Sequence, residues 1–226
     1  MKDTYIRQST LFPGSDNSIL IIGAGGIGSP TALVLAKMGC SNITIVDYDQ
    51  VEIHNVASQF YGEKDLGKLK VNALKENIEM FSSEEIKVIN AKFEKDGLFE
   101  YSENGEKGEQ IPVSKYDIII MAVDSIVARD IIFNNVKNKF ELLIDGRMGG
   151  EFYEIYSVLG IQQNDYLKTL PAPDEIDAGV CTAKAICYNT FGIAANIGAL
   201  VKKFMTTGEI IPELAGCFVN FYTNKE

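Results

Sequence analysis

Four glycines form a short loop that could hold a phosphate group: Gly23, Gly25, Gly26 and Gly28. The loop joins an apolar run at residues 18–22 to a segment at residues 29–38 whose spacing is helical. Glycines allow a tight turn and a close backbone approach, and the first turn of a helix presents free N–H groups to an anion. A tight turn that binds nothing is the alternative interpretation. Between a strand and a helix, the spacing favours a nucleotide phosphate.

Acidic and amide residues follow the next apolar run. Asp47 ends that run, nineteen residues after Gly28, and Asp49, Asn55 and Gln59 come shortly after it. A carboxylate at this place in a dinucleotide-binding fold accepts hydrogen bonds from ribose hydroxyls. The pattern therefore indicates an adenine nucleotide, and it does not decide between NAD and ATP.

The elements that must position these residues alternate along the chain. Strands are expected at residues 18–22, 42–46, 86–90, 116–123, 142–145, 152–159 and 218–222. Helices are expected at residues 29–38, 64–80, 125–136 and 184–206. The remaining long segments are an N-terminal arm at 1–17, a surface excursion with its own turn at 92–112, and a long loop at 161–182. This order predicts one α/β domain over residues 1–226, with a Rossmann-like, doubly wound, mostly parallel sheet and an antiparallel C-terminal extension.

The composition narrows the function classes. With 21 Lys and Arg against 31 Asp and Glu, the net charge of −10 argues against a nucleic-acid surface. The longest apolar stretches, at 118–123 and 191–201, are shorter than the roughly 20 residues that a bilayer span needs. The first residues lack the apolar core of a signal peptide, so a cytoplasmic location with reduced thiols is expected. One His and four Cys without a Cys-x-x-Cys pair predict no zinc site.

Taken together, these motifs resemble the ThiF/MoeB/HesA family, bacterial relatives of the ubiquitin-activating E1 enzymes. The matching residues keep the family's order: Arg7-Gln8, Gly23 to Ser29, Asp47-x-Asp49-x-Val51-x-x-x-Asn55, Gln59, Gly67-x-x-Lys70 and Asp124 to Arg129. The resemblance implies an ATP-dependent adenylyltransferase that uses Mg²⁺. Its implied partner is a small ubiquitin-like or sulfur-carrier protein, typically ending in Gly-Gly, whose C-terminal carboxylate becomes an acyl-adenylate.

The resemblance also implies roles for single residues. Asp47 would hold the ribose hydroxyls, and Asn55 would lie near the triphosphate. Lys70 would neutralise phosphate charge, and Asp124 would ligate Mg²⁺ through a hard oxygen. Arg7 would reach the γ-phosphate bound in a partner subunit, which implies a homodimer. The glycines, Asp49, Gln59 and Arg129 complete the expected nucleotide site.

Several of these residues also have an interpretation that involves no ligand. Lys70 has the sequence environment of a solvated helix residue. Asp124 is placed to cap the following helix, and it can cap the helix and bind a metal at once. Arg129 can pair with a nearby carboxylate rather than with a ligand, and Arg7 alone would be an ordinary surface residue. Ser58 stands where the family usually has Arg, so one phosphate contact is missing and full activity stays open.

The cysteines raise a separate question. Cys181 precedes the last predicted helix, near where some relatives of the family carry a thioester or acyl-persulfide cysteine, so we count it among the candidate catalytic residues. An unreactive thiol at this junction is the alternative. Cys40 and Cys187 are expected in the core. The rival functions are an NAD-dependent oxidoreductase, a relative that activates peptides or small acids, and a degenerate nucleotide-binding scaffold.

Overall fold

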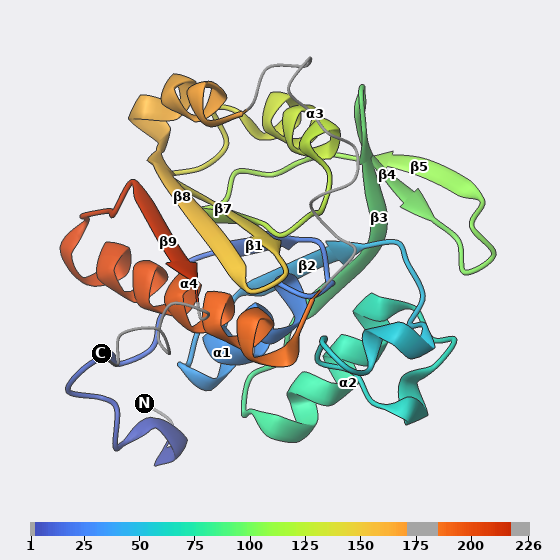
Figure 1. Cartoon of the computed structure of the whole chain (residues 1–226), viewed down its shortest axis with the longest axis horizontal. Coiled ribbons are helices and arrows are strands. Elements are labelled where there is room, and N and C mark those ends of the chain that lie inside the picture. The colour runs from blue at the N-terminus through green and yellow to red at the C-terminus, as the bar shows by residue number, and fades with distance from the viewer. Residues whose placement is uncertain (1–2, 171–184, 218–226) are drawn as a thin grey trace, which may run out of the picture.

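The computed structural model describes residues 3–170 and 185–217, which are built around one nine-stranded sheet (Figure 1). Its strand order is β5-β4-β3-β2-β1-β6-β7-β8-β9. The five central strands run parallel: β1 (Ile19–Ile22), β2 (Ile43–Asp47), β3 (Lys87–Glu94), β6 (Ile118–Met121) and β7 (Leu142–Gly149). Antiparallel strands extend both edges: β4 (Gly97–Tyr101), β5 (Lys107–Ile111), β8 (Phe152–Leu159) and β9 (Glu213–Cys217). The predicted α/β class, with its antiparallel C-terminal extension, is confirmed.

Helices cover both faces of the sheet (Figure 1). One face packs against α1 (Gly28–Lys37), α2 (Lys70–Phe81) and α4 (Cys187–Thr207). The other packs against α3 (Ile126–Val136) and the 3₁₀ helix η4 (Gly160–Thr169). Shorter 3₁₀ helices are η1 (Asp3–Tyr5), η2 (Ile53–Asn55) and η3 (Glu63–Asp65). Along β1, Ile19 and Ile21 join the first apolar cluster, whereas Leu20 and Ile22 join the second, which explains why this strand is apolar throughout.

The order of the central strands fixes where a ligand can bind. β1 lies between β2 and β6, so the chain leaves β1 toward one side for β2 and returns on the other side for β6. The loops after β1 and β6 therefore turn to opposite faces of the sheet and leave a crevice at their carboxyl ends. The glycine loop follows β1, and Asp124 follows β6.

Several peripheral predictions were wrong. The loop expected at 161–182 contains η4 up to Thr169 and passes out of the described residues after 170. The excursion at 92–112 has its expected turn, where Gly105 N–H donates to Ser102 O at 3.0 Å, but its flanks continue β3 and form β4 and β5 of the sheet. The helix expected from residue 64 begins at Lys70, after η3 and a left-handed Gly67. Within the described ranges the chain ends on β9, and the strand predicted at 218–222 lies outside them and stays a prediction.

The N-terminal arm is described from residue 3 onward and is anchored to the far end of α1. The hydroxyl oxygen of the buried Tyr5 lies 3.2 Å from Ala36 O, and Gln8 Nε2 donates to Met38 O at 2.8 Å. Ten residues of α1 span roughly 15 Å, so these anchors lie a helix length away from the glycine loop. No helix within the described ranges is long and apolar enough to cross a bilayer.

Candidate active site

A cleft of about 920 Å³ opens at the carboxyl ends of β1, β2 and β6. Ten of the residues expected in the site line it: Gly23, Gly25, Gly26, Asp47, Asp49, Asn55, Gln59, Lys70, Asp124 and Arg129. Gly28 lies behind the wall in the first turn of α1, and Arg7 is exposed on the arm and absent from the lining. Cys181 lies outside the described residues. The structure thus brings together nearly all of the predicted nucleotide site.

The glycines of the loop serve different purposes. Gly23 has a φ of 99°, and a Cβ placed there would lie 2.6 Å from Ala122 O. A Cβ on Gly28 would lie only 1.8 Å from Gly23 O. The fold itself therefore excludes side chains at both positions. A Cβ on Gly25 would have no atom within 4 Å, so the backbone of Gly25 faces open space in the cleft.

Asp47 is held rigidly at the end of β2. Its Oδ2 accepts the backbone N–H of Ala24 at 2.6 Å, and its Oδ1 accepts that of Asp49 at 2.8 Å. Burial raises the pKa of this carboxyl above its ordinary value, although the charge of Lys70 and the two N–H groups act in the opposite direction. The carboxylate thus links the glycine loop to the loop after β2.

Lys70 and Asn55 lie deeper in the cleft wall than the sequence indicates. Lys70 begins α2, is 8% exposed, and places its Nζ 2.9 Å from Asp49 Oδ2. The interpretation of Lys70 as a solvated helix residue is therefore wrong. Asn55 is buried, and its Oδ1 accepts the backbone N–H of Glu52 at 2.9 Å. Lys70 brings a positive charge to the cleft that is already balanced by a carboxylate.

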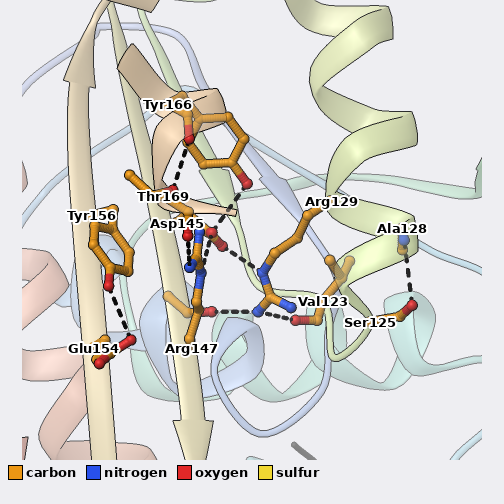
Figure 2. Close-up of polar contacts among 11 residues, drawn as sticks. Val123, Ser125, Ala128, Arg129, Asp145, Arg147, Glu154, Tyr156, Tyr166 and Thr169 are labelled. Carbon is orange, nitrogen blue, oxygen red and sulfur yellow. Dashed lines mark hydrogen bonds and ion pairs between the residues drawn. The ribbon is translucent and has the colours of Figure 1, made fainter. Parts of the chain in front are cut away.

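The turn after β6 carries Asp124 into the cleft. Ser125, not Asp124, caps α3, because its Oγ accepts the N–H of Ala128 at 3.3 Å. Asp124 is exposed, and its side chain makes no hydrogen bond or ion pair within the described part of the chain. Arg129 is 2% exposed and pairs with Asp145 at 2.9 Å, so the expected carboxylate partner exists (Figure 2). The helix-cap interpretation of Asp124 is wrong, and its carboxylate is left free for a ligand.

Other residues were missed or misplaced. Lys92 and Met148 also line the cleft, but the strands expected at 86–90 and 142–145 ended before reaching them. Cys40 is buried as predicted. Cys187 is exposed as the first residue of α4, so its placement in the core was wrong. Ser58 is buried and lines the cleft, where it offers a hydroxyl in place of a cation.

The groups present fit a nucleotide together with magnesium. The loop at Gly25 offers backbone donors for phosphate, and Asp124 offers an unpaired carboxylate at the same cleft. No group of three His, Cys, Asp or Glu side chains that could hold a metal occurs in the described ranges. Mg²⁺ is commonly bound by one or two carboxylates together with substrate phosphates and waters. A single free carboxylate such as that of Asp124 fits this kind of site.

Comparison with known proteins decides the family, because the sequence model of the ThiF family matches residues 14–211. The chain belongs to the ThiF family. It is 29% identical over 197 residues to a probable molybdopterin-synthase adenylyltransferase of Gracilaria tenuistipitata var. liui, covering 85% of this chain and 52% of that protein. It is 33% identical over 115 residues to the adenylyltransferase and sulfurtransferase MOCS3 of Aedes aegypti, covering 50% of this chain and 24% of that protein.

The fold has solved counterparts as well. The crystal structure of E. coli MccB with ATP superposes with a TM-score of 0.64 and 18% identity, covering 88% of this chain and 60% of MccB. At this identity the likeness concerns the fold alone. The ThiF-family chain thus spans about half or less of the two curated relatives described above, and its fold matches 60% of MccB.

Proposed function

We propose that this ThiF-family protein is an ATP-dependent adenylyltransferase that activates the C-terminal carboxylate of a small ubiquitin-like or sulfur-carrier protein ending in Gly-Gly. One observation supports it above all. The glycine loop, Asp47 and Asp124 lie at the ends of three separate strands, Lys70 begins α2, and all of them line one cleft. The names of the two curated relatives, which are adenylyltransferases, point to the same chemistry.

The reaction sets a clear physical problem. A carboxylate attacks the α-phosphorus of ATP, an acyl–phosphate bond forms, and pyrophosphate leaves. Two anions must meet, so catalysis depends on positioning and on compensating charge rather than on a proton donor. Bound Mg²⁺ would supply part of that charge.

The residues of the cleft suit this problem. The N–H groups around Gly25 would receive phosphate oxygens, and Asp47 would hold the ribose. Lys70 would turn its ammonium from Asp49 toward phosphate, and Asp124 would hold the metal. No step requires a general acid.

The missing arginine at Ser58 leaves a cation to be supplied from elsewhere. We propose that Arg7 of a second copy supplies it, within a homodimer. The support is geometric: Arg7 is exposed and absent from the lining of its own cleft, and the arm is anchored at the end of α1 remote from the glycine loop. A cytoplasmic location fits the unpaired Cys40 and Cys187.

The decisive assay is ATP–pyrophosphate exchange that depends on an added carrier protein. We expect exchange with a Gly-Gly-ending carrier, and its loss in Asp124→Ala. Asp130→Ala is the matched control, because Asp130 is an exposed carboxylate on α3 outside the cleft lining. Exchange with a short peptide only would favour the peptide-activating alternative. Absence of exchange with every carrier, together with hydride transfer from NADH, would refute the proposal.

Two further tests address the proposed partner contacts. Arg7→Ala should abolish exchange, and mixing it with Asp124→Ala should partly restore activity if the arm acts across a dimer. No rescue in verified mixed dimers would contradict the arm's role. Loss of a covalent carrier adduct in Cys181→Ala would support transfer to that thiol. The exposed Cys187 is the matched alternative, and loss of the adduct in Cys187→Ala alone would exclude Cys181.

A further inference from the structure

Arg129 lies at the centre of a buried polar network beside the cleft (Figure 2). Its Nε donates to Asp145 Oδ1 at 2.9 Å. Its Nη2 donates to Val123 O at 2.6 Å and to Gly146 O at 3.0 Å. The side chain is 2% exposed, so these bonds form away from water. Most donors of the guanidinium are therefore bound within the protein, where they join α3 to the middle of β7 and to the turn after β6.

Asp145 holds this guanidinium in place. The carboxylate is fully buried on β7, and its second oxygen, Oδ2, accepts from Arg147 Nε at 2.8 Å and from the Tyr166 hydroxyl at 3.1 Å. Arg147 is held in turn by Thr169, through bonds of 2.7 and 2.8 Å. With both oxygens of Asp145 bound to fixed groups, Arg129 has little freedom to turn toward another partner.

The bond to Val123 O fixes the backbone directly before Asp124. On the other side of Asp124, Ser125 is fixed as the cap of α3 and accepts the backbone N–H of Arg129 at 3.0 Å through its carbonyl. Asp124 itself has no side-chain partner in the described residues. Its carboxylate is thus carried on a turn that is held at both ends, and Arg129 takes part in both attachments.

We infer that Arg129, held by Asp145, is a positioning residue for Asp124 rather than a contact to phosphate. The inference rests on the proposed function, because it assigns Asp124 to Mg²⁺. It also revises the sequence-based placement of Arg129 among the nucleotide ligands. One donor, Arg129 Nη1, is buried without a partner in the described part of the chain, and direct contact of this nitrogen with a ligand is the competing outcome.

The first test compares ATP affinity with and without magnesium. Arg129→Lys keeps the charge, but one ammonium cannot replace the planar fork that joins Asp145 to Val123. Partners that orient a metal ligand typically change metal affinity about 10–100-fold when mutated, so the half-saturating Mg²⁺ concentration should rise by that factor. The dissociation constant of ATP in EDTA should change less than about twofold. An equal loss of affinity in EDTA would show direct contact and overturn the inference.

Two further variants show whether the effect is specific to the bond between Arg129 and Val123. Arg147→Lys is the matched comparison, because Arg147 binds the same carboxylate but not Val123, so it should shift the Mg²⁺ dependence by a clearly smaller factor than Arg129→Lys. Tyr166→Phe removes one bond to Asp145 while keeping the ring against Phe133, so it should fold and shift the Mg²⁺ dependence in the same direction by a smaller factor. A shift in Arg147→Lys as large as in Arg129→Lys would contradict the inference.

A double-mutant cycle tests the coupling. In an Asp124→Asn background, Arg129→Lys should add little to the loss of Mg²⁺-dependent ATP binding, since the group being positioned is already gone. Additive losses would show that the two residues act independently, and would overturn the inference.

Hydrogen exchange provides a readout that needs no nucleotide. In Arg129→Lys, a peptide covering 122–128 should exchange faster than in wild type, whereas a peptide containing β1 should not change. Unchanged exchange over 122–128 would refute the positioning role. If the wild-type protein binds no ATP at all, the proposed function fails and the assignment of Asp124 to Mg²⁺ fails with it. The exchange result would still show whether Arg129 holds the turn.

Discussion

Gly25 and Gly28 should respond in opposite ways to the same substitution. At Gly28, an alanine Cβ would lie 1.8 Å from Gly23 O and 2.8 Å from its carbonyl carbon. These atoms belong to the backbone, so a rotamer change cannot relieve the clash. At Gly25, no atom lies within 4 Å of the added Cβ, and the backbone is outside the left-handed region. Gly28→Ala therefore probes the fold, and Gly25→Ala probes the ligand space.

The sizes of the two effects follow from these contacts. Overpacking costs about 1–3 kcal/mol of stability and at times more. Gly28→Ala is therefore expected to lower the free energy of unfolding by ~3 kcal/mol or more. For a domain of this size, that loss lowers Tm by about 6–12 °C. Gly25→Ala should leave Tm unchanged or slightly raised, because a compatible alanine restricts the unfolded chain. Its methyl group would displace a phosphate from the loop N–H groups, and hydrogen bonds to charged groups are worth about 1.5–3 kcal/mol, or about 10–150-fold in affinity.

The assay pairs thermal unfolding with equilibrium binding of MgATP for each variant. Gly25→Ala should fold as wild type and bind ATP weakly, whereas Gly28→Ala should melt early. Wild-type ATP affinity in Gly25→Ala would show that phosphates do not pass this residue, and the phosphate role of the loop would be refuted. A wild-type Tm in Gly28→Ala would contradict the close approach to Gly23.

Three further results are expected. Burial and the charge of Glu84 raise the pKa of the Cys40 thiol to about 12, so iodoacetamide followed by peptide mass spectrometry should find Cys187 modified and Cys40 spared in the native protein. Lys70→Met should weaken ATP binding at least about 10-fold in a titration. Burial raises the pKa of Asp47 above 3.8, so the folded state retains a proton that the unfolded state loses. The stability that this extra proton gives the folded state therefore falls as pH rises from 3.8 through the raised pKa. Thermal unfolding measured against pH should show this fall in the wild-type protein and not in Asp47→Asn.

The centre of the fold could be predicted from the sequence because its strands are buried on both faces. Such strands leave continuous apolar runs, as at 18–22 and 116–123, and the glycine loop marks the turn between the first strand and α1. The helix η4 leaves no such signal. Of its residues only Tyr166 is buried, and a 3₁₀ helix with one inward side chain has no apolar period to detect.

The pairing of Arg129 with Asp145 could not be predicted in the same way. The two residues are sixteen positions apart, and their contact depends on the register that sets Asp145 opposite Met121 on the neighbouring strand. The sequence indicated that Arg129 needs an anion, and it left open whether a ligand or a carboxylate provides it. The packing of α3 over β6 and β7 decides it. The Arg129 guanidinium binds the carboxylate of Asp145 and two backbone carbonyls within the protein.

The cations that line the cleft show how an acidic chain could accommodate an anionic ligand. The cations in the described lining are already engaged: Lys70 with Asp49, Arg129 with Asp145, and Lys92 above the ring of Tyr48. In the proposed complex, a triphosphate would therefore be balanced by loop N–H groups, by Lys70 turned away from Asp49, by Mg²⁺ and by an arginine from a second copy. Among these, Mg²⁺ carries the largest charge, so ATP binding should depend far more on Mg²⁺ than on surface charge or ionic strength. A protein with a net charge of −10 can thus hold an anionic substrate without a basic surface.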